Sequence, residues 1–126
     1  MGAAVKGVVN PVLSGADILA IDDRSDLKKV YVPEWKTDVY LRVLSGVERD
    51  RFELALNDGL TGKAKPNVRA FLAVMCLCDE SGKRLFKDSD AEALGEKNAV
   101  ALDRVFSVAK ELNVLDDEDV ERIEKN

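Results

Sequence analysis

Apolar and polar side chains alternate along the chain on both sides of Pro33. A period of two residues, with β-branched and aromatic side chains among them, is typical of β-strands. Pro33 has no backbone N–H to donate to a strand ladder, so it belongs at a strand end or edge. We therefore predict a β-hairpin over about residues 28–43, with residues 33–38 as its turn.

The helical period of 3.6 residues predominates in the rest of the chain. It predicts helices over about residues 45–56, 96–112 and 116–126, and a short apolar helix at 18–21. Ser45 and Glu48 have the spacing of a capping box, in which each side chain accepts the backbone N–H of the other residue. These signals mark where the helices begin.

The most apolar segment, residues 68–78, carries a single charge. A helix that is apolar on all sides is buried on all sides, so we expect this helix, opening at Pro66, to be the central element. It contains both cysteines, Cys76 and Cys78. Side chains two residues apart on a helix point in different directions. We therefore expect two free, buried thiols and neither a disulfide nor a metal site.

These elements predict an α+β fold, mainly α, in which an N-terminal β-hairpin packs on a small bundle of about four to five helices. A chain of 126 residues is long enough for one domain. We assign this domain to residues 14–126, with residues 1–13 as a flexible N-terminal arm. No apolar run approaches the roughly 20 residues that span a bilayer, so we expect no membrane insertion.

Composition argues against an enzyme. The chain has no histidine, which excludes Ser-His-Asp and Cys-His nucleophiles and the usual zinc sites. Its net charge is −5 and arises within residues 66–126, so binding to nucleic acid is disfavoured. We expect no cofactor and no metal.

Several stretches together resemble one protein family. They are Val-Tyr-Val-Pro-Glu-Trp (30–35), Ser-Gly-Val-Glu-Arg-Asp-Arg-Phe-Glu (45–53) and Cys-Leu-Cys-Asp-Glu-Ser-Gly-Lys-Arg-Leu-Phe (76–86). In this order they resemble the tail assembly chaperones of long non-contractile-tailed bacteriophages and their prophages. The resemblance extends over residues 14–126, whereas the start of the chain departs from it.

The resemblance implies a non-enzymatic role in the cytoplasm of a host bacterium. Such proteins bind and solubilise the tape-measure protein, recruit the major tail protein as the tail tube assembles, and are absent from the mature virion. We expect a homo-oligomer, either a ring or a spiral. The alternative is a small structural phage protein, a head–tail connector or tail-completion subunit, that is retained in the particle.

A chaperone of this kind acts through apolar side chains that contact partners. Trp35, at the hairpin tip, is open to two interpretations, as a core residue or as a contact for another subunit. The residues that we predict to contact a partner or a second copy are Trp35, Tyr40, Phe52, Val120 and Ile123.

Overall fold

The architecture follows from a computed structural model that describes residues 13–57 and 67–125. Its helices are α1 (Gly15–Leu19), α2 (Gly46–Asn57), α3 (Val68–Cys76), α4 (Ala91–Leu94), α5 (Ala99–Leu112) and α6 (Asp117–Lys125). Its strands are β1 (Lys28–Val32), β2 (Thr37–Leu41) and β3 (Leu77–Cys78), and two 3-10 helices, η1 (Pro33–Trp35) and η2 (Asp88–Asp90), lie between elements. The predicted α+β class, mainly α, is confirmed. Within the described ranges, no helix is both long and apolar enough to cross a bilayer.

The predicted hairpin is present. β1 and β2 pair antiparallel, with Val30 opposite Val39 and Tyr31 opposite Asp38. Pro33 opens the 3-10 turn between the strands, where no ladder hydrogen bond is required of it. Lys36 closes the turn in the left-handed conformation, with φ of 55°.

A third strand corrects the prediction of a single helix over residues 68–78. The helix ends at Cys76, and β3 then pairs antiparallel with β2, with Leu77 opposite Leu41 and Cys78 opposite Tyr40. A run that is apolar throughout has no periodicity to show where a buried helix becomes a buried strand. Cys76 and Cys78 therefore lie on different elements, and both are free and buried.

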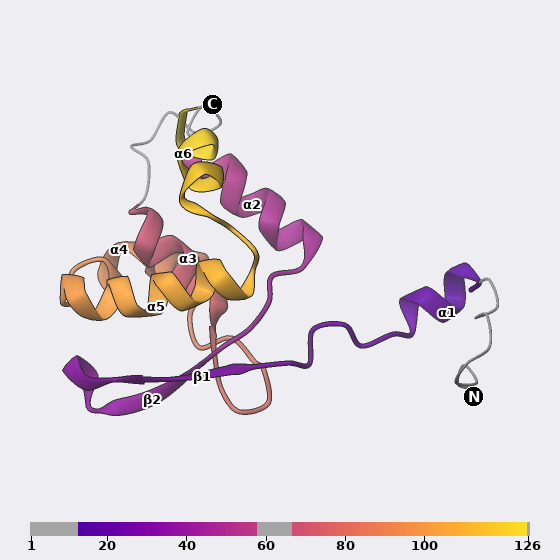
Figure 1. Cartoon of the computed structure of the whole chain (residues 1–126), viewed down its shortest axis with the longest axis horizontal. Helices are drawn as coiled ribbons and strands as arrows, with labels where there is room; N and C mark the ends of the chain where they lie inside the picture. Colours follow the sequence, from indigo (N-terminus) through magenta and orange to yellow (C-terminus); the bar gives the residue numbers. More distant parts are fainter. Residues whose placement is uncertain (1–12, 58–66, 126) are drawn as a thin grey trace.

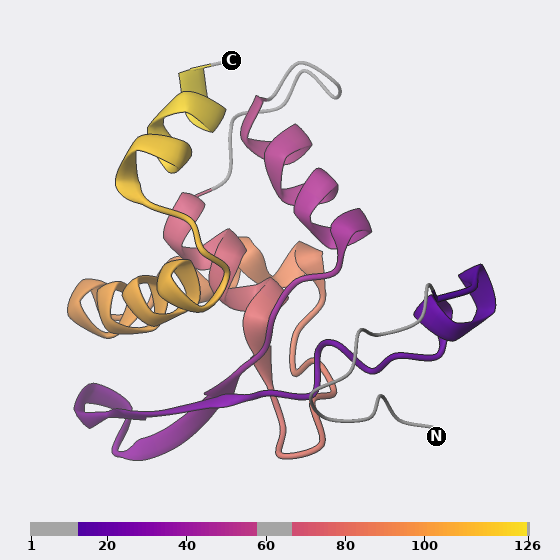
Figure 2. The same ribbon diagram turned by 45° about the vertical axis from the view of Figure 1, so that its right-hand side comes forward.

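The helix α3 is the centre of the core, as predicted. Every residue from Ala70 to Cys76 is buried, and α5, α4 and α2 all pack around it. The Phe71 ring stacks on Phe52 of α2, with the ring centroids 6.1 Å apart. Figures 1 and 2 show helices α2 to α6 gathered on one side of the hairpin, with α6 next to α2.

The helices begin at polar caps. The predicted capping box is formed, because Ser45 N–H donates to Glu48 Oε1 at 2.9 Å and Glu48 N–H donates to Ser45 Oγ at 3.2 Å. The predicted role of Pro66 lies outside the described residues, and the N-cap of α3 is Asn67. The predicted domain boundary at residue 13 falls at the edge of the described chain and stays a prediction.

Candidate functional site

One thiol is deeply buried, and the acidic groups of the described residues form no metal cluster. Burial raises the pKa of the Cys76 thiol to about 12, although nearby Arg42 and the hydrogen bond from Asn113 act in the opposite direction. This thiol is therefore protonated at neutral pH. No three His, Cys, Asp or Glu side chains of the described residues are grouped so as to hold a metal ion.

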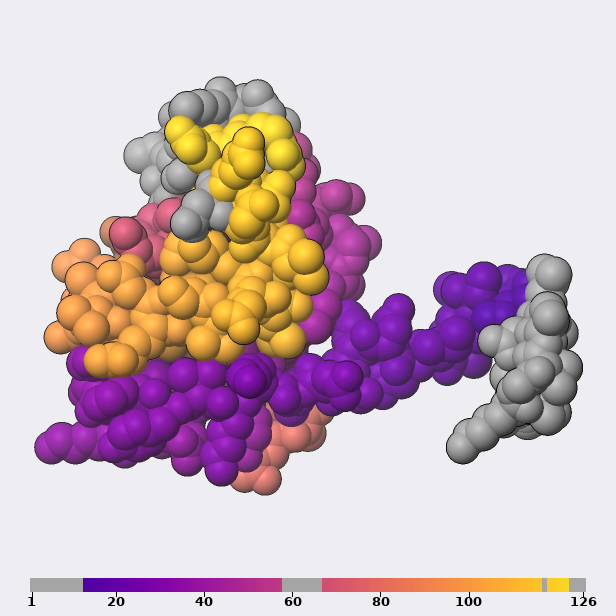
Figure 3. All heavy atoms as spheres, in the orientation of Figure 1, coloured from indigo at the N-terminus to yellow at the C-terminus, as the bar shows by residue number. Residues whose placement is uncertain are grey.

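The most exposed apolar surface lies on the segment before the hairpin. Every residue from Leu13 to Asp26 is exposed, and Figures 1 and 3 show α1 standing away from the hairpin and from helices α2 to α6. We call residues 13–26 the arm. The flexible arm predicted over residues 1–13 is a different segment and, apart from Leu13, lies outside the described residues. Ile18 is 56% exposed and Leu19 87% exposed, although both are large apolar side chains. Leu13 and Ile21 are also about half exposed. Such a group of apolar side chains is typical of a surface that binds another protein.

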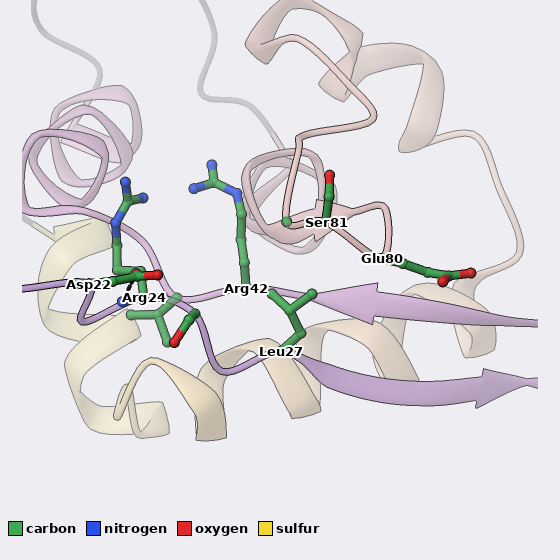
Figure 4. A pocket seen from close by; sticks show the side chains of 9 residues that line it. Asp22, Arg24, Leu27, Arg42, Glu80 and Ser81 are labelled. Carbon is green, nitrogen blue, oxygen red and sulfur yellow. Dashed lines mark hydrogen bonds between the residues drawn. The ribbon is translucent and has the colours of Figure 1, made fainter.

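An ion-pair network lies where the arm joins the body. Arg42, at the end of β2, donates two hydrogen bonds to the Glu48 carboxylate, at 2.9 and 2.6 Å. Arg24 of the arm approaches the same carboxylate at 3.4 Å. Figure 4 shows the Arg24 and Arg42 side chains extending in the same direction, with Glu80 turned away from them. Through Arg24, whose side chain is 44% exposed, the arm contacts the first turn of α2.

Charge is nearly balanced at this junction. Partial burial raises the pKa of Glu48, but hydrogen bonds from Arg42 and from the Ser45 backbone N–H outweigh that effect and lower it to about 2. The carboxylate is thus ionised at neutral pH and shared by two guanidinium groups. The adjacent hollow, of about 270 Å³, is lined by both signs of charge, including Asp22 and Glu80. The positive and negative side chains around this hollow nearly cancel, so its lining does not attract a small anion.

A second hollow, of about 160 Å³, lies between the start of β1 and the last turns of α5. Lys28, Val108, Glu111 and Leu112 line it. Val108 and Leu112 are partly buried and extend the apolar core towards the surface. Just beyond α5, Val114 is 84% exposed. The hollow is therefore an apolar depression with one lysine and one glutamate at its edge.

Two of the predicted contact residues lie on the hairpin. Trp35 is partly buried in η1 and packs against the core, which agrees with its interpretation as a core residue. Tyr40 is partly buried on β2. Tyr31 of β1 is more accessible, at 58% exposed. Trp35 and Tyr40 remain predicted contacts.

The other predicted contacts are less accessible. Phe52 has no exposed surface and Val120 is only 7% exposed, so the folded monomer does not present either side chain. Both complete the hydrophobic face by which a helix packs on the core. The Ile123 side chain lies outside what the structure describes. Sequence reasoning predicted a short apolar helix here but did not name Ile18 and Leu19 as contacts. The signal was available, because two adjacent large apolar side chains on so short a helix cannot both be covered by it.

Comparison with known proteins gives two matches. The family described as phage tail assembly chaperone matches residues 17–126 of this chain. Among solved structures, the chain is similar to the bacteriophage HK97 tail assembly chaperone, at 27% sequence identity and a TM-score of 0.52. The alignment covers 69% of this chain and 84% of that chain. The curated proteins contain no match.

Proposed function

Since this chain belongs to the phage tail assembly chaperone family, we propose that it binds the tape-measure protein, keeps it in solution and recruits the major tail protein while the tail tube assembles. The proposed place of action is the host bacterial cytoplasm, and the protein is left out of the finished particle. The observation that carries the proposal is the arm, with Ile18 and Leu19 exposed beside a closed core.

The physical basis is reversible apolar contact. A chaperone must cover apolar surface of a client without a chemical step, and it needs accessible apolar side chains to do so. The arm supplies such side chains, and the hairpin adds Tyr31 at 58% exposure. Partly buried Trp35 and Tyr40 are further candidates for contact with a partner.

Self-association is the second part of the proposal. A ring or spiral of copies displays many weak client sites at once, so that the overall affinity for a long client exceeds that of one site. We propose such a homo-oligomer, held together by reversible non-covalent contacts and not by a chemical reaction.

Co-expression tests client binding directly. The tape-measure protein is expressed with and without this chain, and its soluble fraction is measured after centrifugation. We expect the soluble fraction to rise and the two proteins to co-purify. Light scattering on the purified chain gives its oligomeric state. An insoluble tape-measure protein together with a strict monomer at high concentration contradicts the proposal.

The composition of purified virions separates this function from the alternative of a retained structural protein. Mass spectrometry of the particles is expected to find the tape-measure protein and the major tail protein and to lack this chain. Finding the chain at a constant stoichiometric ratio in virions favours a head–tail connector or tail-completion subunit.

A further inference from the structure

We propose that the arm binds a positively charged amphipathic segment of the client, in which apolar side chains lie next to lysine or arginine. This inference rests on the proposed function and adds the surface that holds the client and the chemistry of the segment that is held. The surface is the arm, residues 13–26, and the occupant is a segment of a partner protein. Two properties of the arm carry the argument, its exposed apolar side chains and its surplus of negative charge.

The apolar side chains of the arm are concentrated on α1 and the turn that follows it. Ile18, Leu19 and Ile21 are 56%, 87% and 53% exposed, and α1 has no buried residue. The Ile21 N–H donates to Ile18 O at 3.1 Å, so one turn of chain carries all three side chains. An isolated helix this short is unstable in water, and packing of its apolar side normally stabilises it. A partner that covers these side chains therefore buries apolar surface and stabilises α1 at the same time.

The arm is also acidic. Its charged side chains are Arg24 and four aspartates, Asp17, Asp22, Asp23 and Asp26. It therefore holds a net charge of −3 out of the chain's −5. Arg24 Nη1 lies 3.4 Å from Glu48 Oε1, so a carboxylate of α2 compensates the positive charge of the arm. Among the residues that the structure describes, Asp23 and Asp26 have no ion-pair partner, and both are exposed beside the apolar turn.

This charge selects among the possible occupants of the arm. Complementary charge steers and orients binding, so the arm favours a partner with lysine or arginine beside its apolar side chains. Nucleic acid and anionic lipid carry the same sign of charge as the arm, which repels them. The rest of this chain has a net charge of −2, so another copy offers apolar contact without a net electrostatic gain. A cationic amphipathic segment of the client offers both.

The direction and length of the arm set the size of the segment that it can hold. Figures 1 and 2 agree that α1 extends away from the hairpin and from helices α2 to α6, and Arg24 contacts α2 at the base of the arm. No helix or strand forms between Ile21 and Asp26, and this stretch spans at most about 18 Å when extended. A helical partner covers that distance in about 12 residues. We therefore expect a partner helix of about three turns, apolar on one side and cationic at its edge.

Two designed peptides test the charge preference. Both are amphipathic helices of equal length with leucine at the same positions, and one carries lysine and the other glutamate at the polar positions. Fluorescence anisotropy of a label on the peptide measures binding to the full chain, at a dilution where light scattering shows no change of mass with concentration. We expect the lysine peptide to bind about tenfold more tightly than the glutamate peptide at low salt. The difference is expected to shrink as added salt screens exposed charges.

One variant of the full chain removes the apolar contribution of the arm. Ile18→Ser/Leu19→Ser is expected to weaken binding of the lysine peptide about tenfold, because two exposed apolar side chains are lost. Its matched control, Val47→Ser/Leu54→Ser, alters two exposed apolar side chains of α2 and is expected to bind as the parent does.

A second variant removes the uncompensated charge. Asp23→Asn/Asp26→Asn is expected to reduce the preference for the lysine peptide about threefold and to keep the apolar contacts. Its matched control, Asp50→Asn/Glu96→Gln, removes two exposed carboxylates outside the arm and is expected to keep the full preference.

Three results overturn the inference: the two peptides bind equally, neither binds the full chain, or both arm variants bind as the parent does. Co-expression with the tape-measure protein separates these results from the proposed function. A tape-measure protein that stays soluble with the parent and with both arm variants leaves the proposed function intact and removes the arm from it. One that the parent does not solubilise contradicts the proposed function itself.

Discussion

At the C-terminus of α5, Val114 has a left-handed backbone, with φ of 54°. Its N–H donates to Glu111 O at 3.2 Å, and the N–H of Leu115 donates to Lys110 O at 2.7 Å. These two bonds form a Schellman motif, in which glycine is the usual residue at the left-handed position. A β-branched residue there is strained, because its Cβ crowds the backbone.

Replacing Val114 by glycine is therefore expected to stabilise the protein. Relief of the strain outweighs the greater freedom of glycine in the unfolded chain, for a gain of about 1 kcal/mol. The melting temperature is expected to rise by about 4 °C, measured by circular dichroism. Val114→Ala keeps a Cβ and serves as the control. An equal gain in that variant attributes the effect to the loss of an exposed apolar side chain and contradicts the strain argument.

Glu48 gives the protein a specific sensitivity to acid. Its pKa falls from 4.5 to about 2 because Arg42 and the Ser45 backbone N–H donate to the charged form, in spite of partial burial. A lowered pKa in the folded state contributes stability above pH 4.5, and this contribution is lost as the pH falls towards 2. The full loss is on the order of 3 kcal/mol before allowance for solvent screening.

Urea unfolding at a series of pH values tests this expectation. Glu48→Gln removes the titrating group and leaves Arg42, which is only 6% exposed, without its charged partner. We expect the variant to be less stable by about 3 kcal/mol at pH 7 and to lose less stability between pH 4.5 and 2. The exposed Glu80→Gln serves as control. An acid response that is unchanged in Glu48→Gln assigns the sensitivity to other carboxylates.

At the scale of elements, the hairpin tip is held against α5. Arg104 donates from Nε to Glu34 Oε1 at 2.9 Å and from Nη2 to Glu34 Oε2 at 3.1 Å. Trp35 of the same turn packs against the core. The ion pair is exposed and contributes little, whereas the indole ring contributes through burial.

Trp35→Ala is expected to lower the unfolding free energy by about 3 kcal/mol, because it leaves a cavity between the hairpin tip and the core. Glu34→Gln removes only the exposed ion pair and is expected to destabilise the protein much less than Trp35→Ala does. Both values come from chemical denaturation followed by circular dichroism. If Trp35→Ala leaves stability unchanged and weakens association instead, its principal role is contact with a partner.

Elements with a clear hydrophobic period were predictable from the sequence. In the segment without such a period, the central helix was predicted but its end was not. The hairpin alternated over residues 28–43 and its strands lie within that range. The boundary between α3 and β3 was missed, because residues 68–78 are apolar throughout and local pattern says nothing about pairing with β2. Which strand a segment joins depends on contacts distant in sequence.

Which apolar side chains stay exposed depends on how the whole molecule packs, so the exposed surface of the arm was harder to predict than the elements. Phe52 and the run around Ile18 both appear in the sequence as apolar residues in short helical segments. The first is fully buried and the second exposed, because α2 packs on α3 while α1 extends beyond the body. Local sequence encodes helix formation at both sites. Only the tertiary arrangement decides which apolar side chains remain accessible.

Because the arm lies outside the packed core, changes to its side chains are expected to affect association between copies and not the folding of one copy. Serine at Ile18, Leu19 and Ile21 together is expected to change the unfolding free energy of the dilute protein by less than about 0.5 kcal/mol, because these side chains are exposed. Val120→Ser, by contrast, alters a side chain of α6 that is only 7% exposed and is expected to cost about 1–3 kcal/mol. Urea denaturation followed by Trp35 fluorescence measures both.

Repeating these measurements at rising protein concentration adds the effect of association. Binding between folded copies stabilises them by mass action, so the unmodified chain and Val120→Ser are expected to become more stable as concentration increases. The triple serine variant lacks the apolar side chains of the arm, and its stability is expected to stay constant. If its stability rises with concentration as steeply as that of the unmodified chain, the copies associate through a surface other than the arm.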